Sequence, residues 1–225
     1  HHVLNNGFRI TAVGGEDSIA DMHYRQLIGQ NRSYAHLGSR LTWEGWIDAI
    51  RKGRIFVTNG PLLELEVNGR GVGEEVRLPA GGDKVTVRGT VQSIVPVQKI
   101  EIVFRGRVVA AVDPGAGMSV QFHRDIPVSE SGWFTLQVAG TQPVHPIDDS
   151  YPQATTNPVW VLAGDRPVRS AESARYFVRW IDKLSQMAGQ HPGWRSAKER
   201  THVFGQFAEA RKVYERLAAE AEKAR

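Results

Sequence analysis

The chain has 225 residues, 41% of them hydrophobic and 23% charged, a composition that excludes disordered, collagen-like and low-complexity classes. Its 28 basic residues outnumber 24 acidic ones only slightly and are scattered outside the C-terminal tail, so we expect no nucleic-acid groove. The absence of cysteine excludes disulfides and thiolate metal sites, and no apolar run has the length of a membrane span.

The first part of the chain, residues 1–60, predicts a mixed α/β segment. Residues 8–13 predict a short strand that ends at two glycines, and residues 19–38 predict a loop with a strand near 33–37. Thr42 is a good N-cap for a helix whose apolar residues at positions 43, 46, 47 and 50 share one face. Gly53 closes that helix, and residues 55–58 follow as a buried strand.

Residues 61–165 change to a period of two, which predicts β-strands. Alternating apolar residues at 63, 65 and 67 lead to Asn68-Gly69, a hairpin signal. Six further strands are expected, at residues 84–91, 98–104, 108–112, 119–125, 133–139 and 158–162. About seven short strands over about 100 residues are typical of an immunoglobulin-like β-sandwich.

The last part, residues 166–225, predicts a helical hairpin. Ser170 caps a helix with one apolar face, and residues 191–193 break it. Ser196 and Glu199 form a capping box that opens a final helix with a long apolar stripe. The two stripes predict an antiparallel helix pair.

The densest polar stretch follows the first predicted strand and contains Glu16, Asp17, Asp21 and His23. Glycines after a strand leave such side chains exposed at the strand's end, where α/β barrels place catalytic groups. Carboxylate and imidazole groups are ligands for Zn, Mn or Fe, so the stretch is a candidate metal site. The alternative is an acidic loop that caps helices or forms Asx-turns.

Several short blocks occur in a distinctive order: residues 4–10, 14–17, 31–34, 42–46, 54–61 and 156–161, followed by 166–168. This series resembles the C-terminal half of the CehA/McbA-type metallohydrolases, a branch of the PHP (polymerase and histidinol phosphatase) superfamily. The resemblance covers nearly the whole chain, and the block at 54–61 is its most specific part.

The resemblance implies a distorted (β/α)₇ barrel that holds a divalent metal cluster, with an appended β-sandwich. Asp17 matches the aspartate of a Gly-x-Asp-x-His-like ligand motif. Ile19 stands where that motif has histidine, so His23 is expected to substitute as the second ligand. Glu16 is expected to orient a ligand or water, and Asn59, at the end of the last barrel strand, is expected to line the site or to form a turn.

The family's early His-x-His ligands have no counterpart in this chain. We therefore expect the C-terminal portion of a metal-dependent hydrolase of ester, carbamate or phosphoester bonds, which is not catalytic alone. Its expected partners are a missing N-terminal barrel portion or separate chain, a second copy of this chain, and a small-molecule substrate. The strands of the missing portion are expected to pair with residues 8–13 and 55–58. The compartment stays open and includes the periplasm and the extracellular space.

The fold class predicted is therefore α+β: terminal strands and helix of a PHP-like barrel, an immunoglobulin-like sandwich and a helical hairpin. Two other classes of function stay open. In a carbohydrate- or protein-binding module, Trp133 or Trp160 would form an exposed aromatic platform. In a purely structural interaction domain, an apolar surface around Trp43 and Trp46 would be exposed.

Overall fold

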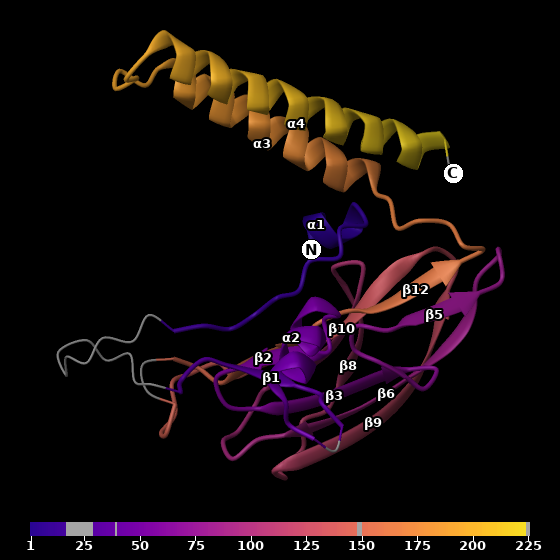
Figure 1. The fold of residues 1–225 in the computed structure, drawn as a ribbon. Helices are drawn as coiled ribbons and strands as arrows, with labels where there is room; N and C mark the ends of the chain where they lie inside the picture. Colours follow the sequence, from indigo (N-terminus) through magenta and orange to yellow (C-terminus); the bar gives the residue numbers. More distant parts are fainter. Residues whose placement is uncertain (17–28, 39, 148–149, 224–225) are drawn as a thin grey trace. The chain divides into compact units, whose positions relative to one another are not determined.

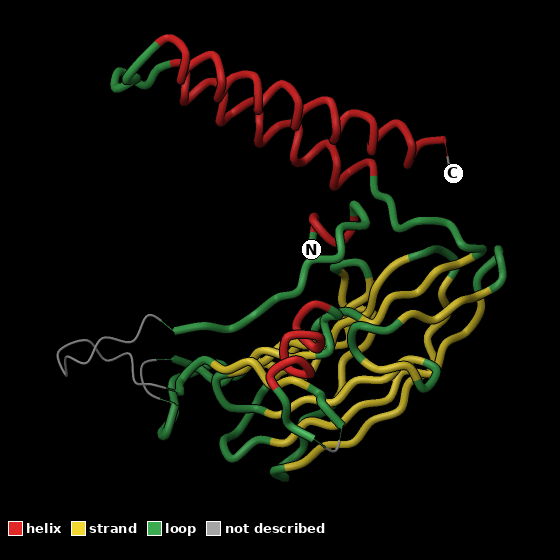
Figure 2. Tube along the Cα trace, in the orientation of Figure 1, coloured by secondary structure: helices red, strands yellow, loops and turns green. Residues whose placement is uncertain are grey.

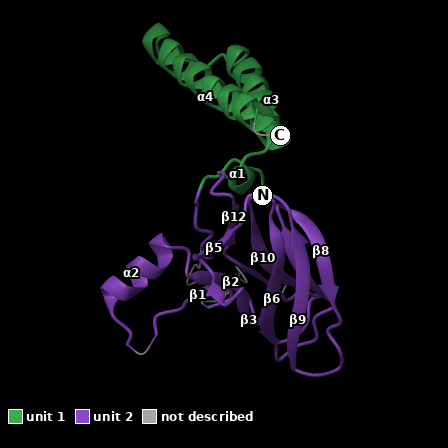
Figure 3. Cartoon of the chain, turned by 90° about the vertical axis from the view of Figure 1, so that its right-hand side faces the viewer, with its two compact units in different colours: residues 1–8, 167–225 green, residues 9–166 purple. Residues whose placement is uncertain are grey.

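The computed structural model describes residues 1–16, 29–38, 40–147 and 150–223 (Figure 1). The chain forms two compact units (Figure 3). One comprises His1–Phe8 with Pro167–Arg225, and the other comprises Arg9–Arg166. The boundary between Arg166 and Pro167 lies where the helical hairpin was expected to begin. Residues 9–60, in contrast, belong to the same compact unit as the strands that follow them.

The larger unit contains twelve strands and one helix in its described part. The helix is α2 (Trp43–Arg51). The strands are β1 (Arg32–Ala35), β2 (Ile55–Thr58), β3 (Leu62–Val67), β4 (Arg70–Gly71), β5 (Glu75–Leu78), β6 (Asp83–Gln92), β7 (Lys99–Phe104), β8 (Arg107–Val112), β9 (Ser119–Val128), β10 (Gly132–Ala139), β11 (Gln153–Thr156) and β12 (Val159–Ala163).

These strands form two sheets, seen as the yellow segments of Figure 2. Among the described residues, the larger sheet has eight strands in the order β1-β2-β11-β10-β12-β5, with β7 and β8 branching from β10. The smaller sheet has four strands in the order β4-β3-β6-β9. All pairs are antiparallel except β12 with β5. No barrel is closed by the strands that the structure describes.

A single hydrophobic core joins the two sheets. Val85 and Val87 of β6 are completely buried and belong to the same cluster as Phe134 and Leu136 of β10. Strand β3 shows how the sequence produces this: its residues alternate strictly between exposed and buried, which places every second side chain in the core. The predicted α+β class is therefore confirmed, with two mainly antiparallel sheets that share one core.

Two short segments differ from the expectation. Residues 8–13, predicted as a strand, form none. The backbone of Ala12 instead pairs with the side chain of Asn157, which accepts from its N–H at 2.8 Å and donates to its carbonyl at 2.9 Å. The second difference concerns partners: β2 already pairs with β1 and β11, so residues 55–58 offer no free edge to another chain. Among the described strands, the edge at this end of the larger sheet is β1.

The smaller unit is helical. Its helices are α1 (His2–Asn5), α3 (Ala171–Gly189) and α4 (Ala197–Lys223). The predicted caps are confirmed, since Ser170 Oγ accepts from Ser173 N at 3.2 Å and Ser196 Oγ accepts from Glu199 N at 3.1 Å. Helices α3 and α4 pack on each other as the predicted hairpin, with the rings of Phe177 and Tyr214 stacked at 4.6 Å between centroids.

Candidate functional site

The expected metal ligands Asp17 and His23, with the nearby Asp21, lie outside the described residues. Their neighbour Glu16 is described. Its carboxylate accepts a hydrogen bond from the backbone N–H of Gly29 at 2.7 Å and another from the N–H of Asn31. Glu16 therefore links the residues on either side of positions 17–28 through two charge-assisted hydrogen bonds.

Asn59, the other expected site residue, follows β2 and is 6% exposed. Its carboxamide extends the β2–β11 ladder by one position, because Oδ1 accepts from Gln153 N at 2.7 Å and Nδ2 donates to Tyr151 O at 2.9 Å. Both polar atoms of the side chain are thus bonded to backbone. The backbone carbonyl of Asn59 is left to accept from Arg32 Nη2 at 3.0 Å.

Arg32 is the residue that the sequence did not single out. It opens β1 and pairs in register with Thr58, which brings its side chain beside Asn59. Its Nε is buried and has no hydrogen-bond partner in the described part of the chain. The Nε of Arg54 is likewise buried without a partner among the described residues, but its Nη2 pairs with the carboxylate of Asp48, a partner that Arg32 lacks. The sequence around these two arginines does not show which of them lacks a carboxylate partner, and Arg32 was therefore missed as a site residue.

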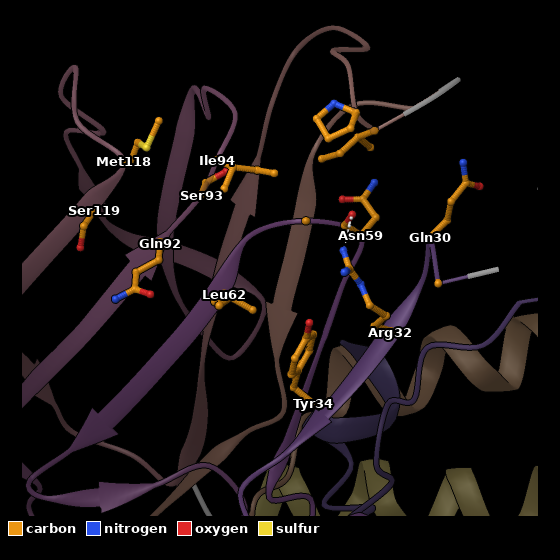
Figure 4. Close-up of a pocket in the computed structure, with 14 residues that line it drawn as sticks. Gln30, Arg32, Tyr34, Asn59, Leu62, Gln92, Ser93, Ile94, Met118 and Ser119 are labelled. Atoms are coloured by element: carbon orange, nitrogen blue, oxygen red, sulfur yellow. Dashed lines mark hydrogen bonds between the residues drawn. The ribbon is translucent and has the colours of Figure 1, made fainter. Parts of the chain in front are cut away.

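Arg32 and Asn59 line an open groove of about 620 Å³ within the larger unit (Figure 4). Polar side chains that line it are Gln30, Arg32, Asn59, Gln92, Ser93 and Ser119. Apolar or aromatic side chains that line it are Tyr34, Leu62, Ile94, Met118, Pro146 and Ile147.

The groove lies between the ends of the two sheets. One wall comes from β1 and the residue after β2, and the other from the start of β3, the end of β6 and the start of β9. Leu62, Gln92 and Ser119 are consecutive neighbours across the three strands of that second wall. Figure 4 shows Arg32, Asn59 and Gln30 on one side and Met118, Ser119 and Gln92 on the other.

The described residues lack the donor set that a PHP-like cluster requires. Within them, no three histidine, aspartate or glutamate side chains come together. Glu16 is the one expected site carboxylate that is described, and both of its oxygens accept backbone N–H bonds. The described donors therefore do not form a metal centre, and the proposed ligands Asp17 and His23 stay a prediction.

Trp133 and Trp160 do not form an aromatic platform. The two residues are paired across β10 and β12 and are 0% and 4% exposed. Arg9 covers the Trp160 ring at 5.0 Å from its centroid. The sugar-stacking arrangement considered for a binding module is therefore wrong at these two positions.

The surface around Trp43 and Trp46 is exposed. Trp43 is 67% exposed and Leu41 is 82% exposed, and the two indole rings stack at 5.5 Å between centroids. With Thr42 they line a shallow pocket of about 330 Å³. The apolar face of α2 predicted from its spacing is thus left partly uncovered by the described residues.

In sequence comparisons, no family model and no curated protein matches this chain. Among its described helices, none is long and apolar enough to cross a lipid bilayer.

Proposed function

We propose that this chain is the C-terminal portion of a PHP-like metal-dependent hydrolase that cleaves ester, carbamate or phosphoester bonds, and that it is not catalytic alone. The observation that carries the proposal is the placement of the resembling blocks. The most specific one, 54–61, contains β2 and ends in Asn59, which lines the groove, and block 31–34 supplies Arg32 to the same groove.

In this proposal Asp17 is a metal ligand and His23 the second, and the ion is Zn, Mn or Fe. A bound divalent metal would supply hydroxide near neutral pH and polarise the scissile bond. The described residues have positioning roles. Glu16 holds the Gly29 and Asn31 amides, and Asn59 orients Arg32 through its carbonyl.

The rest of the fold is assigned in the same proposal. Strands β3 to β12 correspond to the immunoglobulin-like module appended to the barrel, and residues 1–60, which add β1 and β2 to the larger sheet, correspond to the end of the barrel. The remaining barrel strands belong to an upstream portion of the same protein or to a separate chain. Support comes from Trp43 of α2 and Leu41 just before this helix, which leave an apolar surface for that portion to cover, and from β1, an edge strand of the larger sheet among the described strands.

The decisive experiment uses the full-length gene product. We expect purified protein to contain bound divalent metal and to hydrolyse an ester such as 4-nitrophenyl acetate. Asp17→Ala should lower both metal content and activity, whereas Asp113→Ala, in an exposed turn where Oδ1 accepts from Gly115 N at 2.9 Å, should change neither. Unchanged metal content and activity in Asp17→Ala would remove the assignment.

A second measurement tests the surface of α2. The separately expressed upstream portion should bind this chain, and Trp43→Ser should weaken the complex. Trp180→Ser is the matched control, because Trp180 is 47% exposed in the helical unit. A homodimer of this chain that Trp43→Ser dissociates would instead assign the surface to a second copy.

A further inference from the structure

We propose that the groove beside Arg32 binds a small organic anion, a molecule with a carboxylate or a phosphate on an apolar body, and that Arg32 contacts the anionic group. The proposal concerns binding by this chain and does not depend on the proposed hydrolase activity or on a metal.

The charge of Arg32 is the first argument. Among the described residues it makes no ion pair, and its single hydrogen bond goes to a neutral carbonyl, that of Asn59. Its Nε is buried without a partner among the described residues, as is that of Arg54, so the missing carboxylate is what sets Arg32 apart. A partly buried guanidinium with unused donors is costly unless an anion compensates it. Other arginines of the same unit, such as Arg9 with Glu75 and Arg54 with Asp48, have a carboxylate of the protein for this purpose.

The rigidity of the Arg32 surroundings is the second argument. Asn59 is 6% exposed and its side chain is bonded to Gln153 and Tyr151, which holds in place the residue whose carbonyl accepts from Arg32. Tyr34 lies two residues further on the same strand face, and the Arg32 guanidinium lies 6.0 Å from its ring centroid. The Tyr34 ring in turn stacks on Phe56 at 5.2 Å. A pre-positioned guanidinium loses less conformational entropy on binding.

The opposite wall gives the third argument, because it is apolar and exposed. Met118 is 72% exposed, Ile94 is 70% exposed and Leu62 is 39% exposed, and all three line the groove. Gln92 and Ser119 add hydrogen-bonding groups on the same side. A volume of about 620 Å³ lies within the range of small-molecule sites.

Two other ligand classes fit the described lining of the groove less well. A metal ion would meet the cation Arg32 and no cluster of described carboxylates or imidazoles. A nucleic acid requires several phosphate contacts, and Arg32 is the one basic side chain among the residues that line the groove as described. One fixed cation facing an apolar wall fits a small amphipathic anion.

The test is to titrate this chain with phenyl phosphate, with 3-phenylpropanoate and with the neutral 3-phenylpropanamide. Calorimetry and amide NMR measure the binding. We expect both anions to bind about tenfold more tightly than the amide, as a charge-assisted hydrogen bond implies. Chemical shifts should change at Arg32, Asn59 and Ser119. The anion that binds more tightly identifies the preferred headgroup. The difference in affinity between phenyl phosphate and inorganic phosphate measures the contribution of the apolar body.

Arg32→Gln should weaken both anions about tenfold and leave the neutral amide unchanged. Arg124→Gln is the matched control: within the described residues its Nη1 donates to His123 O at 2.9 Å on β9, outside the groove, so binding should stay unchanged. If Arg32→Gln fails to fold, Met118→Ser tests the same groove at an exposed side chain and should weaken the phenyl probes more than inorganic phosphate. Equal affinity for anion and amide, wild-type affinity in a folded Arg32→Gln, or no binding of either anion at about 10 mM would overturn the proposal.

Discussion

Asn157 pairs with Ala12 as one peptide group pairs with another. Its Oδ1 accepts from Ala12 N at 2.8 Å, its Nδ2 donates to Ala12 O at 2.9 Å, and Nδ2 also donates to Ile55 O at 3.0 Å. At 1% exposure the carboxamide is shielded from water. The segment after Phe8 is therefore held against the larger sheet by a side chain rather than by a strand ladder.

Asn157→Ala should destabilise the larger unit by about 2–4 kcal/mol, because three hydrogen bonds are lost and buried backbone groups are left without partners. Urea unfolding followed by circular dichroism of the β-sheets measures this change. Gln121→Ala, at an exposed position of β9, is the control and should stay within about 0.5 kcal/mol of wild type. A loss as small as that of the control would mean that residues 9–14 are not held by Asn157.

The same pair explains which elements the sequence could predict. Strands β3, β6 and β9 alternate regularly and were expected at nearly their observed positions. Strand β11 (Gln-Ala-Thr-Thr) and the short β5 were missed because neither has a long apolar alternation. Residues 8–13 have a strand-like composition, but composition cannot reveal that the pairing partner of Ala12 is a side chain 145 residues away.

The Glu16 carboxylate gives a second prediction, at the level of local stability. Glu16→Ala should increase amide hydrogen exchange at Gly29 and Asn31 about tenfold, because a charge-assisted hydrogen bond is removed from each. Glu16→Gln retains one acceptor oxygen and should give a smaller increase. Glu74→Ala is the matched control, since its Oε2 accepts from Gly71 N at 2.8 Å and its loss should affect that amide alone. Unchanged exchange at Gly29 and Asn31 would show that Glu16 does not hold them.

The candidate site could be predicted only in part from the sequence. The Gly-Pro turn after β2 and the resembling block drew attention to Asn59, and Asn59 lines the groove. Arg32 and the apolar wall at Met118 and Ile94 could not be found in this way, because they meet only when the ends of two sheets come together. Within the described part of the chain, Arg32 lacks a carboxylate partner because of the residues that the fold places around it. The neighbouring residues in the sequence do not predict this.

Two glycines give a matched test of backbone fit. Gly73 has φ +82°, and a Cβ there would lie 2.2 Å from the carbonyl oxygen of Lys52. Gly69 has φ +72° and no heavy atom within 4 Å of its Cβ position. Gly73→Ala should therefore cost at least about 3 kcal/mol in unfolding free energy, and Gly69→Ala about 1 kcal/mol. Equal costs for the two variants would mean that the loop at Gly73 moves away from Lys52 without penalty.

The helical unit should show a pH dependence that originates at Tyr214. Burial against Phe177 and Phe8 raises the pKa of the Tyr214 phenol above its ordinary value of 10.0 through desolvation. Because the folded-state pKa is the higher one, the neutral phenol contributes stability that is fully present below pH 10.0 and is lost as the pH rises through the folded-state pKa.

Tyr214→Phe keeps the stacked ring and removes the titration. Its free energy of unfolding should therefore improve relative to wild type between about pH 9 and about pH 11, since only the wild type loses this contribution. Helical circular dichroism during urea unfolding at several pH values measures the difference. Val213→Ala, on the same helix, changes no ionisable group, so its difference from wild type should stay constant over this range. A constant difference for Tyr214→Phe as well would show that Tyr214 titrates alike in the folded and unfolded chain, which would contradict a desolvated phenol between α3 and α4.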